Sequence, residues 1–457
     1  MMRTPWAPLC AALGVVLTFA CHGDSEKRAQ PTPEATAATQ PETPPAASPA
    51  PSKSTKATSS ENHATELEPA SKPDKASGHD EPHTHHEHAG HGHGHSTFSP
   101  CPIPADQAKV PKHLLDQASR EYRAGRFATA FDCASTAADL APRSIDAHHM
   151  RAAAAAGLGR FDIAQVGFAL ALALDPDDPE TLSASADFYI NALPRTGRES
   201  ILVGLEYARR GRAEAVVRRG VSADLRARLA LLEAQSLNDL GLAEEALVRT
   251  ADTLRLAPAS REAYHERGVA LFNLCRFDSA KDAFIRVLRS APNDAYAHYH
   301  LGLIHERLGR AARSEHHFRK ARALSPHEFW EPVPVSAEEF QNEVTEALSE
   351  LPGELRSMVG QVAIEIVDLP DLDDLTAVDP PFSPTILGLF RGLPLAMDAA
   401  QYDREIPDRA IVLYRKNLAR AVRSRKELDR QIRQTLLHEI GHLSGLDEDA
   451  LRRRGLE

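Results

Sequence analysis

The chain has 457 residues, of which 42% are hydrophobic and 26% are charged, and its formal net charge is −11. This length suits two or three domains. Lys and Arg are spread along the chain and outnumbered by acidic residues, which excludes the basic surface of a nucleic-acid-binding protein. We therefore expect no nucleic acid among its partners.

The five cysteines are not spaced as a disulfide framework, and no two of them form a C-x-x-C pair. Cys133 and Cys275 lie in alanine-rich helical stretches, where we expect them to be small core residues. Cys101 lies in the loop-like run S-P-C-P-I-P and has no evident partner.

Residues 1–21 have the pattern of an export signal. A basic residue precedes a short apolar run at 6–20, too short for an ordinary membrane span, and the run ends in a small residue before Cys21. It resembles a bacterial lipoprotein signal, with Leu17 four residues before the cysteine rather than three. The resemblance implies a lipid anchor at Cys21; the alternative is an ordinary secretory signal with an incidental cysteine. Either way, we expect an exported protein of the bacterial cell envelope.

Residues 22–104 are expected to form a disordered, proline- and alanine-rich linker. Between residues 22 and 97 there is no aromatic residue, so this stretch cannot bury enough apolar surface to offset chain entropy. The tract 79–95 carries eight histidines, whose neutral imidazoles can bind zinc, copper or nickel. The tract is either a metal-gathering segment that supplies a zinc site or a low-complexity spacer.

Residues 105–330 are helical and repeat with a period of 34. Glycine or another small residue, and proline, recur at that interval in two registers. The first register contains Gly125 and Gly159, and Pro142 and Pro176. The second contains Gly241, Cys275 and Gly309, and Pro258, Pro292 and Pro326. The two registers do not join cleanly, which predicts two regular repeats, an irregular one over about 180–224, and three more regular ones. We expect the extra residues of the irregular repeat near Leu193–Gly197.

This pattern resembles the tetratricopeptide repeat, which has a glycine at the turn between its two helices and a proline after the second. The resemblance implies an all-α solenoid, because each helix pair needs a neighbour to cover its apolar face. The groove of such a solenoid commonly binds a protein or peptide partner. The alternative is a structural spacer or docking collar for the next domain.

Residues 331–457 lack the 34-residue repeat and contain β-rich runs, so we expect them to form a small α+β domain. A helix over 337–351 is followed by short β-rich runs at 362–368, 386–391 and 409–415, each bounded by Pro, Gly or Asp. A last helix extends from about Glu427 to Leu443. Its apolar face repeats every four residues, at Ile432, Leu436 and Ile440.

That helix carries the run H-E-I-G-H-L-S-G-L-D-E at 438–448. His438 and His442 are at i and i+4, so both imidazoles project from one face with the separation that a tetrahedral Zn²⁺ needs. Glu439 is displaced around the helix, where it can take the proton of a zinc-activated water as the water attacks a carbonyl. The alternative is a structural helix with solvated His and Glu side chains.

Gly445 lets the chain leave the helix, since glycine tolerates left-handed backbone angles. The chain can then return an acidic side chain to the metal. Glu448, six residues after His442, stands where the extended motif H-E-x-x-H-x-x-G-x-x-(H/D/E) has its third ligand, and the fourth position is left for water. Asp447 and Asp449 flank it, and Asp447 is the alternative ligand.

Residues 337–457 resemble the minimal zincin-like metallopeptidase family. The resemblance is carried in order by FQNEVTEALSELP, VAIEIVD, ILGLFRGLPL, PDRAIVLYRKNL and IRQTLLHEIGHLSGLDEDALRRRGL. It implies His438, His442 and an acidic third ligand at Glu448, with Glu439 catalytic. The strand at Leu387–Phe390 is a candidate edge for an extended peptide substrate. Tyr414 and Arg415 are either oxyanion helpers or ordinary strand-end residues, and the second interpretation is favoured.

We therefore expect an envelope-anchored zinc metallopeptidase that hydrolyses peptide bonds through a water activated by Glu439, with the repeat array recruiting a protein or peptide. The rival is a repeat-protein scaffold lipoprotein whose zinc domain is structural or inactive. A third possibility is a metal-handling lipoprotein dominated by the tract 79–95.

Overall fold

The computed structural model describes residues 101–194, 197–398 and 407–456. The expected signal with Cys21, the linker up to residue 100 and its tract 79–95 lie outside the described residues, so these expectations stay predictions. Among the described residues, no helix combines the length and the apolar character needed to cross a bilayer.

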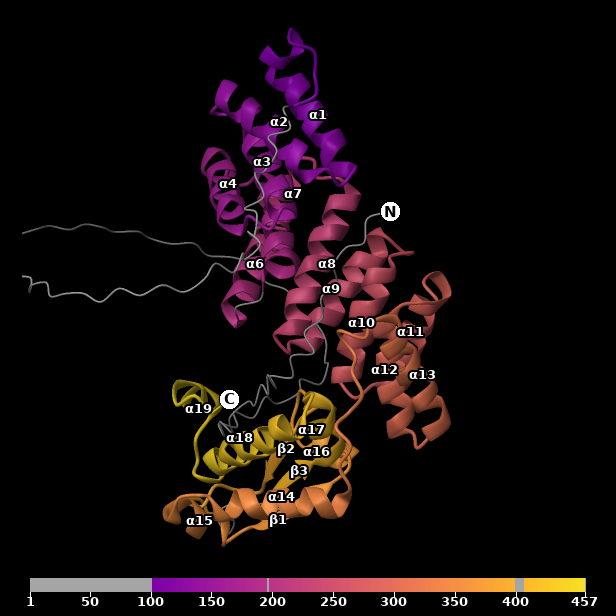
Figure 1. The fold of residues 1–457 in the computed structure, drawn as a ribbon, viewed down its shortest axis with the longest axis vertical. Coiled ribbons are helices and arrows are strands. Elements are labelled where there is room, and N and C mark those ends of the chain that lie inside the picture. Colours follow the sequence, from indigo (N-terminus) through magenta and orange to yellow (C-terminus); the bar gives the residue numbers. More distant parts are fainter. Residues whose placement is uncertain (1–100, 195–196, 399–406, 457) are drawn as a thin grey trace, which may run out of the picture. The chain divides into compact units, whose positions relative to one another are not determined.

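Residues 111–324 form stacked helix pairs, as the 34-residue period predicts (Figure 1). The first two pairs are α1 (Pro111–Arg123) with α2 (Phe127–Leu140) and α3 (Ile145–Gly157) with α4 (Phe161–Leu174). The last three are α8 (Ala223–Asp239) with α9 (Ala243–Leu256), α10 (Arg261–Asn273) with α11 (Phe277–Ser290), and α12 (Ala295–Arg307) with α13 (Ala311–Leu324). A short 3-10 helix, η1 (Gln107–Lys109), precedes the array.

The irregular repeat lies between these two groups, where it was expected. Its first helix, α5 (Pro179–Asp187), continues into a π-helical turn, η2 (Phe188–Ala192), and pairs with α6 (Arg198–Gly211). The expected position of the extra residues is largely wrong. Most of them follow α6, around the short helix α7 (Glu214–Val217), and lengthen α8 to 17 residues against 13 for α10.

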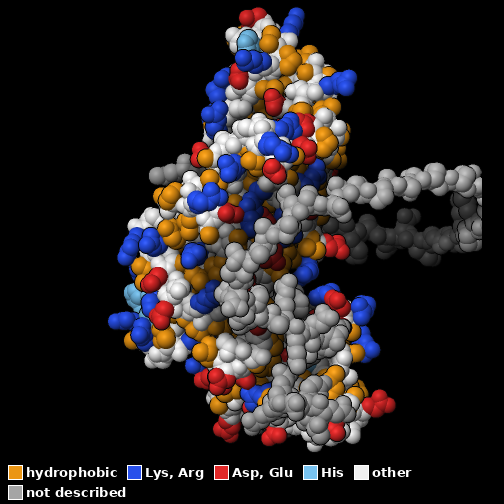
Figure 2. Space-filling view, turned by 180° about the vertical axis from the view of Figure 1, so that it is seen from behind, with side chains coloured by type: hydrophobic (Ala, Val, Ile, Leu, Met, Phe, Trp, Pro, Cys, Tyr) orange, Lys and Arg blue, Asp and Glu red, His pale blue; other side chains and the backbone are white. Residues whose placement is uncertain are grey.

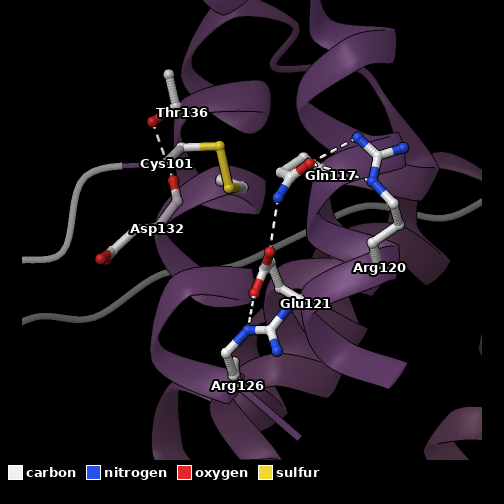
Figure 3. The surroundings of a disulfide bond; sticks show 8 residues. Cys101, Gln117, Arg120, Glu121, Arg126, Asp132 and Thr136 are labelled. Carbon is white, nitrogen blue, oxygen red and sulfur yellow. Dashed lines mark hydrogen bonds and ion pairs between the residues drawn. A yellow bond between two sulfur atoms is a disulfide. The ribbon is translucent and has the colours of Figure 1, made fainter. Parts of the chain in front are cut away.

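A disulfide joins Cys101 to Cys133, so the expectation that Cys101 has no partner is wrong (Figure 3). Cys133 is fully buried on α2, and Cys101 packs beside it against α1, over Leu114 and Ala118. The pairing depends on a loop folding back onto a helix 32 residues further on, which no local spacing signals. The bond fixes the start of the array.

The C-terminal domain is α+β. Helices α14 (Ala337–Ser349) and α15 (Gly353–Val359) precede a three-stranded sheet of β1 (Ala363–Val367), β2 (Gly388–Arg391) and β3 (Ala410–Tyr414). The sheet order is β1-β3-β2, with β1 parallel and β2 antiparallel to β3, so both β1 and β2 are edge strands. The remaining helices are α16 (Leu372–Leu375), α17 (Arg415–Ala421), α18 (Arg425–Leu443) and α19 (Glu448–Arg453).

Strand β3 is buried on both faces, and alternate residues enter two different cores. Ile411 and Leu413 pack with α14 and α18, including Ile432, Leu436 and Ile440 as the helical periodicity predicts. Ala410, Val412 and Tyr414 enter a second core with Leu375, Phe382 and Ile386. The first of these cores holds α18 against the sheet. This packing fixes the position of the histidine motif that α18 carries.

The second core also takes in a residue of the repeat array. Cys275 was expected inside a helix but lies half-buried in the turn between α10 and α11, at a position that is glycine in other repeats, with φ of 58°. Its thiol lies 3.7 Å from the carbonyl oxygen of Phe382. At the end of α12, Glu306 pairs with Arg420 at 2.7 Å, and Arg307 donates to the carbonyl of Pro370. The last repeats therefore pack directly on the C-terminal domain.

On the face shown in Figure 2, Lys and Arg side chains lie among acidic and hydrophobic ones.

Candidate metal centre

The two motif histidines are presented by α18. The helix begins after Ser424, whose hydroxyl accepts the backbone N–H of Glu427, and it is held by its buried apolar stripe. His438 and His442 leave the helix one turn apart, and their Nε2 atoms are 3.2 Å from one another. The i,i+4 spacing thus brings the two rings together.

Glu448 completes a cluster of three donor atoms. Its Oε1 lies 3.2 Å from Nε2 of His442 and 3.6 Å from Nε2 of His438. Two ligands about 2.05 Å from a tetrahedral zinc ion are roughly 3.3 Å apart, which is the spacing found here. Among the described residues, His438, His442 and Glu448 form a group whose ligand atoms all lie within 4.8 Å of one another, close enough to hold one metal ion. The donor set therefore fits zinc.

The outer nitrogen of each ring has its own partner. Nδ1 of His438 lies 2.9 Å from the carbonyl oxygen of Leu456, and Nδ1 of His442 lies 3.0 Å from that of Leu446. Since a carbonyl can only accept, each Nδ1 carries a proton, and each Nε2 is the nitrogen that faces the cluster. Such backbone partners fix the orientation of metal-binding histidines. No local pattern indicates the role of Leu456, because it depends on the chain returning to α18.

A tight turn brings Glu448 back to α18. Gly445 has a φ of 86°, as the expected left-handed exit requires, and Leu446 donates its N–H to the carbonyl of Gly441. Gly441 lets α19 approach, because a Cβ there would lie 2.2 Å from Leu451. Asp447 instead caps α19 through the N–H of Ala450, which favours Glu448 as the acidic member of the cluster.

Glu439 is 4% exposed and faces the edge strand β2. Its carboxylate accepts the backbone N–H of Phe390, and a Cβ on Gly388 would lie 2.9 Å from its Oε1. Burial raises the pKa of Glu439, partly offset by the charges of the two histidines and by the Phe390 N–H. The residue expected to act as the base is therefore beside the cluster but outside its donor set.

The electrostatics of the cluster favour a cation. Burial by itself lowers the pKa of His438, but its hydrogen bond to Glu448 and the charge of Glu439 outweigh burial and bring that pKa to about 9. The same carboxylates raise the pKa of His442. Two carboxylates beside two imidazoles attract either protons or a metal ion.

The strand expected as a peptide-binding edge, β2, is an edge strand, and it lies against α18. Tyr414 and Arg415 are engaged elsewhere. The fully buried Tyr414 hydroxyl donates to Asp374 at 3.1 Å, and Arg415 pairs with Asp368 at 2.9 Å. Both are thus strand-end residues with structural partners, as the favoured interpretation predicts.

One ion pair near the metal cluster was not predicted from the sequence. Arg391, the last residue of β2, forms two hydrogen bonds with Asp374, at 2.9 and 3.0 Å. The two are 17 residues apart in segments without a shared periodicity, so the sequence carried no signal for the pair.

Comparisons with known proteins match the two regions separately. Residues 359–456 match the family model of the zincin-like metallopeptidases, and residues 265–328 match that of the tetratricopeptide repeat. No curated protein matches the chain.

Several solved structures are similar to part of this chain. They include pilF of Pseudomonas aeruginosa, at 14% identity and a TM-score of 0.41, covering 52% of this chain and 99% of that one. PilW, described as a type IV pilus biogenesis factor, has 18% identity and a TM-score of 0.41, covering 51% and 97%. YrrB, described as a repeat protein with an unusual peptide-binding site, has 17% identity and a TM-score of 0.34, covering 43% and 94%.

Proposed function

We propose that this protein, whose C-terminal domain is a zincin-like metallopeptidase domain preceded by tetratricopeptide repeats, is a zinc-dependent peptidase. The observation that supports this most is the convergence of two Nε2 atoms and one Glu448 oxygen at tetrahedral spacing, with Glu439 beside them. His438, His442 and Glu448 would hold the ion, and a fourth position would stay open.

Zinc bound there would lower the pKa of a water molecule and polarise the carbonyl of the scissile peptide bond. Glu439 would accept the proton of that water as the water attacks the carbonyl carbon, and would then give it to the departing amine nitrogen. The raised pKa of its buried carboxylate suits the first step, because a stronger base takes the proton more readily. The Phe390 N–H keeps the carboxylate turned toward β2.

The substrate is proposed to be an extended peptide that lies along β2. This strand is hydrogen-bonded to β3 on one side, and it approaches Glu439 through Gly388, where a side chain would collide with the carboxylate. An extended peptide adding to such an edge gains main-chain hydrogen bonds. Its scissile bond would then lie next to the metal cluster.

The repeat array is proposed to recruit or orient a protein or peptide partner, by analogy with the fold. The protein is proposed to be exported and anchored to the envelope through a lipid at Cys21. The disulfide between Cys101 and Cys133 supports an oxidising compartment, because such bonds persist outside the cytosol.

The test compares the full-length protein with its Glu439→Gln variant. The wild type is expected to contain one zinc ion per chain and to cleave members of a broad peptide library. The variant should keep the zinc and lose roughly 10²- to 10⁴-fold in rate, the usual contribution of a general base. Unchanged hydrolysis in the variant would refute the role given to Glu439. A zinc-loaded wild type that cleaves no peptide would instead support the alternative that the protein is a repeat scaffold with a structural or inactive zinc domain.

A further inference from the structure

Strand β2 has only four residues and is hydrogen-bonded to a neighbour on one side. It is antiparallel to β3, with Gly388 opposite Leu413 and Arg391 opposite Ala410. A short strand at an edge is held by few backbone bonds, so side-chain contacts decide how firmly it is placed. For the proposed peptidase this matters, because the strand contacts Glu439.

Arg391 ties the end of β2 to the rest of the sheet. Its guanidinium forms a two-pronged pair with Asp374 on α16, and its Nη1 donates to Glu365 on β1 at 3.1 Å. The Tyr414 hydroxyl on β3 donates to the same Asp374. Side chains from β2 and β3 thus meet at Asp374, whose side chain is 11% exposed, and Arg391 links this pair to Glu365 on β1.

This network lies one residue from the site. Phe390, directly before Arg391, donates its backbone N–H to Glu439, and Gly388 packs against the same carboxylate. A shift of β2 therefore moves the group that orients Glu439 and the edge proposed for the substrate. The metal cluster would be unaffected, because its members are carried by α18 and α19.

We propose that Arg391 is a positioning residue of the peptidase: through Asp374 it holds β2 in the place where the strand orients Glu439 and receives the substrate. This inference rests on the proposed function. A lysine cannot replace the arginine, since one ammonium group cannot form the planar two-pronged pair with Asp374 and also reach Glu365.

The experiment uses the full-length protein and the variants Arg391→Lys and Asp374→Asn. Arg415→Lys is the matched control, because Arg415 also pairs with an aspartate in this domain but does not touch β2. Zinc content, kcat and KM on a peptide cleaved by the wild type, and hydrogen exchange of β2 amides by mass spectrometry are measured for each.

Arg391→Lys is expected to keep one zinc ion and to lose roughly 100-fold in kcat/KM, the scale of a misplacement by about 1 Å, with part of the loss in kcat. The β2 amides should exchange at least about tenfold faster, as for a locally loosened strand. Asp374→Asn should show the same changes to a smaller extent, and Arg415→Lys should match the wild type.

Equal activity and equal β2 exchange in Arg391→Lys and Arg415→Lys would overturn the inference. So would a loss of activity accompanied by loss of zinc, which would indicate a general structural role. If the wild type itself cleaves no peptide, the proposed function fails, but the exchange measurement still decides whether Arg391 holds β2.

Discussion

The histidine cluster of the last repeat, His298, His305 and His317, and the motif histidines of the C-terminal domain have opposite electrostatics. In the array, Nδ1 of His298 lies 2.9 Å from Nδ1 of His317, and the ring of His305 stacks on His317. Burial, then neighbouring imidazoles and Lys320, lowers the pKa of His317 to about 4. In the C-terminal domain, carboxylates raise the pKa of His438 to about 9 despite burial.

The difference lies in what surrounds the rings. Beyond the effect of burial, His305 and His317 have imidazoles, lysine and arginine side chains as their charged neighbours, which lower their pKa values, so they remain neutral parts of a helix interface. The motif histidines face Glu439 and Glu448. Proximity of imidazoles therefore does not make a cation site; converging carboxylates do.

The largest effect is expected on zinc binding. It comes from removing the carboxylate of Glu448, which lies beside the motif histidines and not beside the histidine cluster of the array. Glu448→Gln should weaken zinc binding by more than roughly 100-fold, because even partners of metal ligands contribute 10- to 100-fold. Zinc affinity is measured by competition with a chelator. His317→Gln, in the array, serves as the control and should leave zinc affinity unchanged. Equal affinity in Glu448→Gln would exclude Glu448 as a ligand.

A smaller effect is expected where α18 and α19 approach most closely. In Gly441→Ala the new Cβ would meet Cδ2 of the fully buried Leu451 at 2.2 Å, so this side chain must shift and the packing of α19 on α18 should loosen, at a cost of about 1–3 kcal/mol. The thermal midpoint and zinc affinity should both fall. Gly353→Ala is the control, since nothing lies within 4 Å of a Cβ there. If both variants behave alike, the close approach does not position Glu448.

The smallest effect concerns acid stability of the array. The folded-state pKa of His317, about 4, is below the ordinary value of about 6.5, so the unfolded chain takes up the proton first. Stability should therefore be lost as pH falls from about 6.5 to about 4, by on the order of 1 kcal/mol once solvent screening is considered.

Thermal unfolding followed by circular dichroism across this pH range checks the acid effect. His317→Gln should flatten the dependence, and His113→Gln, at an exposed position on α1, should not. A pH dependence that is the same in wild type and His317→Gln would show that this histidine does not titrate differently on folding.

Local patterns predicted those parts of the molecule that depend on neighbours in sequence. The 34-residue period predicted the helix pairs, and short β-rich runs bounded by Pro, Gly or Asp predicted the three strands within two residues. The spacing of His438 and His442 was sufficient because the helix itself fixes how their rings lie. Glu448 was predicted from motif spacing, and Gly445 bends the chain as that motif requires.

The sequence by itself determined the solenoid, the α+β domain and the residues of the metal cluster, since each follows from a period or a short spacing. Only the tertiary structure decided the Cys101–Cys133 bond, the contact of Cys275 with Phe382 and the pairing of Arg391 with Asp374. These contacts join segments that lie far apart in the chain or share no periodicity. Their partners are chosen by the packing of whole elements, which no local pattern records.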